Sequence, residues 1–457
     1  MGDLYSDDDP YYRKTKLNSG IPPPSTRDQR QYRRPDAPDL SCWNPSFRRA
    51  QVDDRREYPR QLRQQQEHRS TSSDAPPRPH AVPKPAPKLD LRVSTDFLSC
   101  GQEPGSQKLS LDKITEAIQV SDAEIDYEFL SSGALVEKAT ALRAKISEVP
   151  AHLVSLARAR SNPFERIGKS IFMNRAATKL AALDVTFGLL QDATLTFVDI
   201  CGGPGGFSEY LLWRAHSWGG EAQGFGITLK APSDLDYLNW HVEQFRSDAM
   251  PSKLKILNGV DGTGDLYKEE NIRDFAKQVL QQTEQKGVDL AVADGGFDFS
   301  GKEEHQERHA KRLLLCEIIT MLLCLKQGGT FVCKFFDIVE EFTADMVWLL
   351  YQLFDSICIT KPLSSRPANS ERYLVCKGLR FLKPSTLIER LLGISKEAET
   401  AGRLVPRSLL ESDENFLDYV KTRNIKFVLK QIDALELLQQ YIEEPLVSYS
   451  SIHGKQK

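Results

Sequence analysis

The residues best suited to chemistry are a lysine and an acid, each at the end of an apolar segment. Asp294 follows the run VDLAVA and precedes two glycines, and Lys334 lies within GTFVCKFFD. A carboxylate at the end of a buried strand is costly unless it is paired. A buried lysine tends to have a lowered pKa and can act as a base. Judged alone, Lys334 is alternatively an amine that reaches solvent past a sheet edge.

A glycine-rich segment follows another apolar run, in FVDICGGPGGFSEYLLWR at 197–214. Glycines allow unusual φ angles and remove Cβ, so a ligand can lie against the backbone. The helix expected at 206–217 would offer free N–H groups to a carboxylate or phosphate. The segment lacks the Gly-x-Gly-x-x-Gly spacing and the Lys-Ser/Thr of a phosphate loop. By itself it is equally typical of a tight turn.

A second glycine-bearing segment, GVDGTGDL, offers Asp261 and Asp265. A carboxylate on such a loop can accept hydrogen bonds from an adenine amino group or a ribose hydroxyl. It can equally cap a helix in an ordinary surface turn.

The elements that must position these residues alternate along the chain. Strand-length apolar runs are found at 195–201, 222–229, 253–260, 288–296, 329–337, 355–362 and 371–379, and segments of helical periodicity separate most of them. This alternation predicts an α/β fold with a mostly parallel sheet covered by helices on both faces. In doubly wound sheets, ligands bind at the carboxyl ends of the strands, where these polar residues fall.

Composition divides the chain into four parts. Residues 1–105 are predicted to form a disordered, mildly basic Pro/Arg-rich arm, because 1–90 hold 14 of the 25 prolines and little aliphatic content. Helical extensions are expected at 106–160 and 381–457, and a helix at 170–190. The catalytic core is expected at 161–380.

Several classes of protein are disfavoured. No apolar run is long enough to span a membrane, and the acidic start is not a signal peptide. The eight cysteines show no Cys-x-x-Cys pair, so we expect a reducing compartment and no disulfide framework. His305 and His309 are four residues apart, but no third ligand is evident and no metal site is expected.

Five ordered segments carry a family resemblance: MNRAATK, CGGPGGFSEYLLWR, ADGGF, CKFFD and SRPANSERYLVCKG. Together they resemble the cap-specific mRNA 2′-O-methyltransferases of the FtsJ/RrmJ-like class. The resemblance covers roughly 155–380 and implies a Rossmann-like S-adenosylmethionine-dependent methyltransferase fold. It implies a catalytic Lys-Asp-Lys-Glu tetrad of Lys179, Asp294, Lys334 and Glu371.

The resemblance also implies a role for each member of the tetrad. The sulfonium methyl is already activated, so the enzyme mainly aligns a ribose 2′-oxygen with it. Lys334 is expected to be the base, with its pKa depressed by Lys179, while Asp294 and Glu371 orient the amines.

Ligand contacts follow from the same resemblance. S-adenosyl-L-methionine is expected to contact Asn174, Cys201, Gly202, Gly203, Pro204, Gly205, Gly206, Phe207, Asp265 and Leu266. The capped mRNA 5′ end is expected to contact Arg158, Glu304 and Asn369, with Arg143 and Lys145 as weaker candidates. Arg158 is alternatively part of a solvated helix face, and Glu304 a surface charge.

The expected function is methylation of the first transcribed nucleotide of capped mRNA, in the nucleus. Alternatives are an FtsJ-type enzyme for cap 2, ribosomal RNA or transfer RNA, and a catalytically silent RNA-binding scaffold. No G-patch or WW module of the larger family members is recognised, so protein partners through them are not expected.

Overall fold

A single sheet dominates the computed structural model, which describes residues 92–101, 107–167, 171–296 and 306–444. All of these lie in one compact unit that begins at Pro83. The strands are β1 (Leu98–Ser99), β2 (Thr194–Ile200), β3 (Glu221–Ile227), β4 (Leu254–Ile256), β5 (Val288–Ala293), β6 (Leu325–Phe335), β7 (Phe354–Thr360) and β8 (Arg372–Leu379). Their order is β1-β7-β8-β6-β5-β2-β3-β4.

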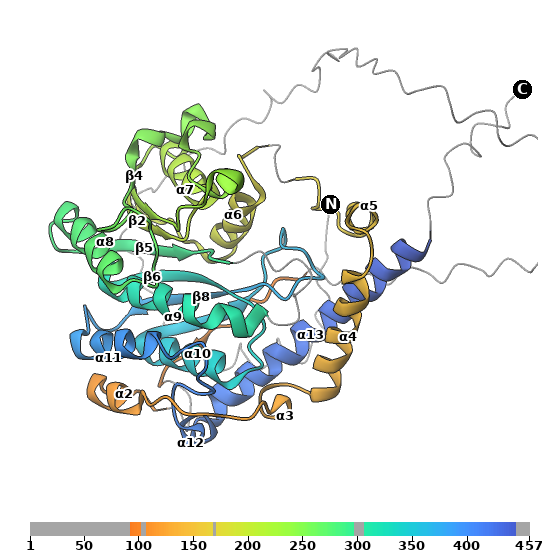
Figure 1. Cartoon of the computed structure of the whole chain (residues 1–457). Helices are drawn as coiled ribbons and strands as arrows, with labels where there is room; N and C mark the ends of the chain where they lie inside the picture. The colour runs from red at the N-terminus through yellow and green to blue at the C-terminus, as the bar shows by residue number, and fades with distance from the viewer. Residues whose placement is uncertain (1–91, 102–106, 168–170, 297–305, 445–457) are drawn as a thin grey trace, which may run out of the picture. The chain divides into compact units, whose positions relative to one another are not determined.

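The helices surround this sheet (Figure 1). The α-helices are α2 (Leu111–Ala117), α3 (Tyr127–Leu130), α4 (Gly133–Ser147), α5 (Ala151–Ser161), α6 (Arg175–Phe187), α7 (Gly206–Ser217), α8 (Glu269–Gln282), α9 (Gln306–Cys324), α10 (Glu341–Leu353), α11 (Ser385–Ser395), α12 (Arg407–Ser412) and α13 (Glu414–Glu443). Short 3₁₀ turns η2 (Ser233–Leu238), η3 (Val242–Gln244), η4 (Ser247–Ala249) and η5 (Pro251–Lys253) separate β3 from β4.

Strand direction places the site. Strands β4, β3, β2, β5 and β6 are parallel, whereas β8 is antiparallel to both β6 and β7. The chain order reverses between β2 and β5, and a doubly wound sheet binds ligands beyond the strand ends at such a reversal. Here Ile200 pairs with Ala293, and Ala293 with Cys333. The residues that follow these partners therefore emerge side by side.

Alternate side chains of the strands enter two separate cores, as the two-residue period of a strand requires. Ile200 and Ala293 face a core that includes α8, α9, α10 and α11. Phe197 and Val292 face the other core, which includes α6 and α7. The expected α/β fold, a mostly parallel sheet with helices on both faces, is confirmed.

The outer parts differ in detail from the predictions. Residues 92–101 fall within the predicted disordered arm, yet β1 pairs with β7 and Leu98 is buried. The rest of that arm lies outside the described residues. The helix expected at 170–190 begins only at Arg175, because Asn174 caps it by accepting from the Ala176 N–H.

The two expected helical extensions pack on each other. Helices α4 and α5 share a small apolar core with α13, formed by side chains such as Leu142, Val154 and Leu435. Among the described helices, none combines the length and apolar character needed to cross a bilayer.

Candidate active site

The four residues expected to form the tetrad lie together at the carboxyl ends of β5 and β6. Lys179 Nζ lies 2.7 Å from Glu371 Oε2 and 3.8 Å from Asp294 Oδ2. Lys334 Nζ lies 3.1 Å from Asp294 Oδ1. The side chains are only 11–14% exposed, so solvent screens these ion pairs weakly. Two amines and two carboxylates thus form one partly buried, linked cluster.

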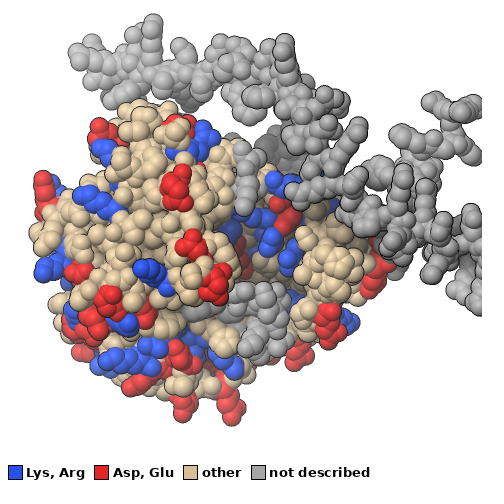
Figure 2. Space-filling view, turned by 45° about the horizontal axis from the view of Figure 1, so that its top comes forward, with Lys and Arg blue, Asp and Glu red and all other residues tan. Residues whose placement is uncertain are grey.

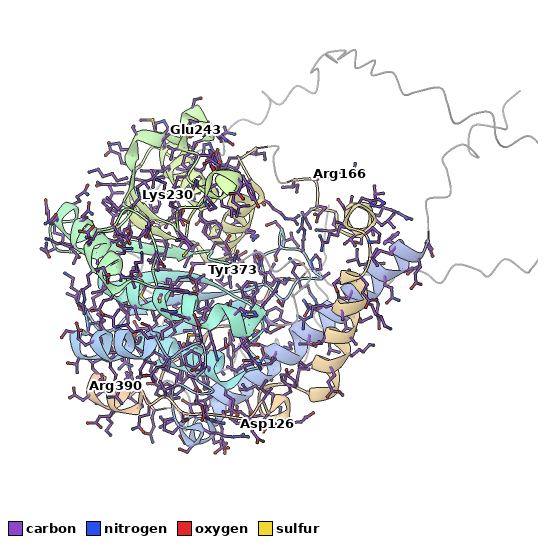
Figure 3. The ribbon with its side chains drawn as sticks, in the orientation of Figure 1. Asp126, Arg166, Lys230, Glu243, Tyr373 and Arg390 are labelled. Atoms are coloured by element: carbon purple, nitrogen blue, oxygen red, sulfur yellow. The ribbon has the colours of Figure 1, made fainter. Side chains whose placement is uncertain are left out.

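Strand β8 supplies a residue that the sequence analysis did not single out. Lys334 pairs with Tyr373 across the antiparallel β6–β8 ladder. The Tyr373 hydroxyl donates to Asp294 Oδ1 at 2.7 Å, and Figure 3 shows this side chain deep within the unit. Ser365 similarly donates to Glu371 Oε1 at 2.7 Å. The sequence around Tyr373 does not indicate this contact, because the contact depends on a strand partner that is distant in sequence.

The charge state of Lys334 differs from the sequence-based expectation. Burial favours its neutral amine, but the carboxylates of Asp294 and Glu371 outweigh burial, so the pKa of Lys334 is raised. The expected depression of the pKa of Lys334 is therefore wrong. Burial would raise the pKa of Glu371, but Lys179 and Lys334 hold it well below its usual range.

The glycine loop, residues 201–207, joins β2 to α7. A Cβ added to Gly206 would lie 2.1 Å from Asn174 Oδ1, and one on Gly205 would lie 2.5 Å from the Phe245 ring. A Cβ on Gly203 would lie 2.4 Å from the Leu238 carbonyl oxygen. These glycines therefore allow α6 and the 238–245 segment to pack closely against the loop. This packing requires glycine whether or not a ligand also lies against the backbone.

The start of α7 is anchored by Glu209, whose side chain is fully buried. Its carboxylate accepts from the backbone N–H groups of Met173 at 2.7 Å and Arg246 at 2.9 Å. Asn174 follows Met173 directly, so Glu209 fixes the expected cofactor contact Asn174 beside the loop. Phe207 is buried in the same core as α6 and α7.

Two buried polar atoms near the glycine loop have no hydrogen-bond partner among the described residues: the acceptor Asp199 Oδ1 and the donor Trp240 Nε1. A Cβ on Gly202 would lie 2.6 Å from Asp199 Oδ1 and 2.6 Å from the Trp240 ring carbon Cη2. Asp199 Oδ2 accepts from both the N–H and the hydroxyl of Ser208. Burial raises the pKa of Asp199 to about 7. An acceptor and a donor without partners, on two side chains that pack against a Cβ-free position, suit a ligand with amino and carboxylate groups. The chain's residues therefore fit S-adenosylmethionine at this loop.

The second expected cofactor segment also lies at the strand ends. A Cβ on Gly264 would lie 1.9 Å from the Thr228 carbonyl oxygen, just beyond β3. Asp265 Oδ1 accepts from the Tyr267 N–H, and Leu266 is buried. Asp261 instead serves the loop itself, since it accepts from Thr263 and pairs with Lys268.

One residue expected at the RNA, Arg158, lies near a partly buried acid that sequence reasoning missed, Glu165. Arg158 lines a pocket with Glu165 and Arg366. Glu165 pairs with Arg175 at 2.9 Å and Arg366 at 2.7 Å, and these arginines outweigh burial and lower its pKa to about 2. Glu165 therefore ties α5, α6 and the loop that carries Glu371 together.

The other candidates differ in position. Asn369 is exposed on that loop, whereas Glu304 lies outside the described residues. Arg143 is already ion-paired with Asp337 at 2.9 Å, and Lys145 is exposed.

Lys361 was also missed. Its ammonium donates to the carbonyl oxygens of Asn369 at 2.8 Å and Glu371 at 2.5 Å. Burial lowers the pKa of Lys361 to about 7. It lines a pocket between its loop and α13, beside Glu371 and Phe427. This lysine therefore shapes the backbone that presents both Asn369 and Glu371.

Comparison with known proteins defines the class of this core. Residues 172–379 match the family described as "FtsJ-like methyltransferase". The α/β core is thus similar to FtsJ-like methyltransferase domains, and the matched segment holds all four residues of the tetrad.

The curated relatives are more specific. The chain is 38% identical to "Cap-specific mRNA (nucleoside-2'-O-)-methyltransferase 1" of Dictyostelium discoideum, over 66% of this chain and 42% of that protein. It is 38% identical to the protein of the same name from Mus musculus, over 64% and 37%, and 37% identical to that of Homo sapiens, over 64% and 37%. The chain spans about two-fifths of the length of these relatives.

Proposed function

We propose that this chain transfers a methyl group from S-adenosyl-L-methionine to the ribose 2′-hydroxyl of the first transcribed nucleotide of capped mRNA. The observation that carries this proposal is the convergence of Lys179, Asp294, Lys334 and Glu371 beside the glycine loop. The names of the relatives support the substrate and, with it, a nuclear location.

The cofactor supplies a methyl group already activated on a sulfonium sulfur. The chain's residues hold it: Asn174, the loop from Cys201 to Phe207, and the Asp265–Leu266 segment. Asp199 and Trp240, whose side chains pack against Gly202, carry one acceptor and one donor without partners among the described residues. The orphaned polar atoms gain partners on binding, which favours this site over a purely structural turn.

The tetrad then orients the ribose. Lys179 and Lys334 place two amines beside the same carboxylate, Asp294, so a 2′-hydroxyl there would meet fixed donors and acceptors. Lys334 is protonated at neutral pH, because its pKa is raised. It must lose that proton before it accepts one from the hydroxyl. Transfer should therefore accelerate as pH rises.

The remaining RNA contacts are assigned to residues around the tetrad. Asn369 lies on the loop that Glu165 and Lys361 hold, and Arg158 lines a pocket beside that loop. Figure 2 shows Lys and Arg side chains gathered in a recess on one face of the unit, a suitable surface for a phosphate chain. A contact between Glu304 and the capped RNA is proposed on the family resemblance alone.

The test is mass spectrometry of short transcripts after incubation with S-adenosylmethionine. Capped RNA should gain one methyl on the first ribose, whereas uncapped RNA should gain none. Lys334→Met should abolish transfer while RNA binding remains. Lys311→Met is the matched control, because Lys311 is also buried but donates to the Ala401 carbonyl outside the site.

Each other outcome has a meaning. Methylation of the second nucleotide, or of uncapped ribosomal or transfer RNA, would replace the assigned substrate. If wild-type protein binds capped RNA but transfers no methyl group to any of these RNAs, the chain is a scaffold.

A further inference from the structure

A buried acid lies behind the proposed active site, on α9. Glu317 is 1% exposed and lies outside the tetrad. Its Oε1 accepts from the Gly295 N–H at 3.1 Å, and its Oε2 accepts from the Cys333 thiol at 3.6 Å. Glu317 also interacts with the Cys201 thiol.

These three partners stand at the ends of three strands. Cys201 follows β2 and begins the glycine loop, Gly295 follows Asp294 after β5, and Cys333 precedes Lys334 in β6. One carboxyl group therefore touches a neighbour of each functional element: the cofactor loop, the acid of the tetrad and the expected base. Among the described residues, this convergence links the active-site strands to the helix layer beneath.

The fit around Glu317 is close. A Cβ on Gly295 would lie 2.2 Å from Glu317 Oε1 and 3.1 Å from Cys201 Cβ. Cys201 has a φ of 57°, in the left-handed region that a non-glycine residue rarely adopts. Such a conformation persists only where its surroundings hold it. The backbone at both positions therefore depends on what packs against it.

We propose that Glu317 is a positioning residue, which fixes Asp294 and Lys334 relative to the glycine loop and adds a negative charge behind Lys334. The proposal rests on the proposed methyltransferase function. It assigns to Glu317 a role in alignment and not in contact with substrate.

Electrostatics gives this role a measurable signature. Burial raises the pKa of Glu317 to about 7, and Lys334 opposes that rise. In turn, Glu317 joins Asp294 and Glu371 in raising the pKa of Lys334. The other titratable groups facing Glu317 are the thiols of Cys201 and Cys333. Removing this charge should therefore lower the pKa of Lys334.

The test compares Glu317→Gln with Glu317→Asp and with a matched control, Asp345→Asn. Asp345 is an equally buried carboxyl on α10, where it accepts from the Leu404 and Val405 N–H groups away from the tetrad. Its pKa is likewise raised by burial to about 7. Asp345→Asn therefore reports the effect of neutralising a buried acid as such.

Glu317→Gln should lower kcat by about tenfold to about a hundredfold, the scale of a misaligned site. Its rising pH limb should move to lower pH, because Lys334 loses a carboxylate neighbour. Glu317→Asp keeps the charge but shortens the reach, so kcat should fall without a shift of the limb. Calorimetry should show weaker binding of S-adenosylhomocysteine by both Glu317 variants, because the Cys201 contact is lost or lengthened.

The readouts separate two failures. Absence of methyl transfer by the wild type would refute the proposed function. Calorimetry of S-adenosylhomocysteine binding would still test whether Glu317 positions the glycine loop. The positioning role is overturned if Glu317→Gln and Glu317→Asp bind S-adenosylhomocysteine and transfer methyl as the wild type does. It is also overturned if Asp345→Asn reproduces the same losses. If Glu317→Gln does not fold, Glu317→Asp decides by the same criteria.

Discussion

Replacing Tyr373 with Phe would test whether the sheet, as well as the tetrad itself, sets the geometry of the proposed reaction. The substitution removes a single oxygen from a side chain with 0% exposure and leaves its packing volume nearly unchanged. What is lost is the hydroxyl that donates to Asp294 Oδ1 at 2.7 Å. Asp294 then retains Lys334 and Lys179 as its charged partners, without the neutral donor that fixes its rotation.

The size of the effect follows from the bond. A hydrogen bond to a charged group contributes about 1.5–3 kcal/mol. If this orientation is needed in the transition state, kcat falls between about 10-fold and about 150-fold, since about 1.36 kcal/mol is tenfold in rate. Binding of S-adenosylhomocysteine should stay within about twofold, because the substitution keeps the ring that packs against Phe207 of the loop, with ring centroids 6.4 Å apart, and removes only the hydroxyl that bonds Asp294.

The assay is single-turnover methyl transfer to capped RNA, with cofactor affinity measured by calorimetry. Tyr210→Phe is the control, because the Tyr210 hydroxyl donates to Asp184 Oδ2 at 2.8 Å in an equally buried setting away from the tetrad. Both variants should lose similar thermal stability, but only Tyr373→Phe should lose rate. Equal rates for the two variants, within about twofold of wild type, would show that Asp294 needs no help from β8.

Two further changes test the loop and the buried acids. Gly206→Ala should weaken cofactor binding at least about tenfold and destabilise the fold by about 1 kcal/mol, because its Cβ would lie 2.1 Å from the Asn174 oxygen that caps α6. The control is Gly393→Ala, where a Cβ meets nothing within 4 Å and should stabilise the fold slightly. Loss of cofactor binding in both variants would contradict this explanation. Burial raises the pKa of Asp345 to about 7, so the folded state keeps a proton that the unfolded chain releases near its ordinary value of 3.8. Its contribution to stability is therefore lost as pH rises from about 4 to about 7. In thermal melts, the melting temperature of Asp345→Asn should rise relative to that of the wild type across that pH range, and the difference should stay constant above it. A difference in melting temperature that does not change with pH would refute the raised pKa of Asp345.

Local pattern was enough for most elements. The helix expected at 206–217 is α7 with the same bounds, and the apolar run that ends at Ala293 is β5. Both follow from periodicity within a few turns of chain, where neighbours in sequence decide the structure. The four residues that the family resemblance assigns to the tetrad do lie together, and their catalytic role stays a prediction.

The connections among those motifs were decided by tertiary structure. Tyr373 reaches Asp294 only because β8 runs antiparallel beside β6, and Glu317 reaches three strand ends only because α9 crosses beneath them. The pKa of Lys334 was predicted to be lowered but is raised, because a pKa depends on burial and on every nearby charge together. Sequence thus determined which groups are present and on which elements. The packed fold alone determined their distances, and distance and burial decide how strongly charges and hydrogen bonds act on one another.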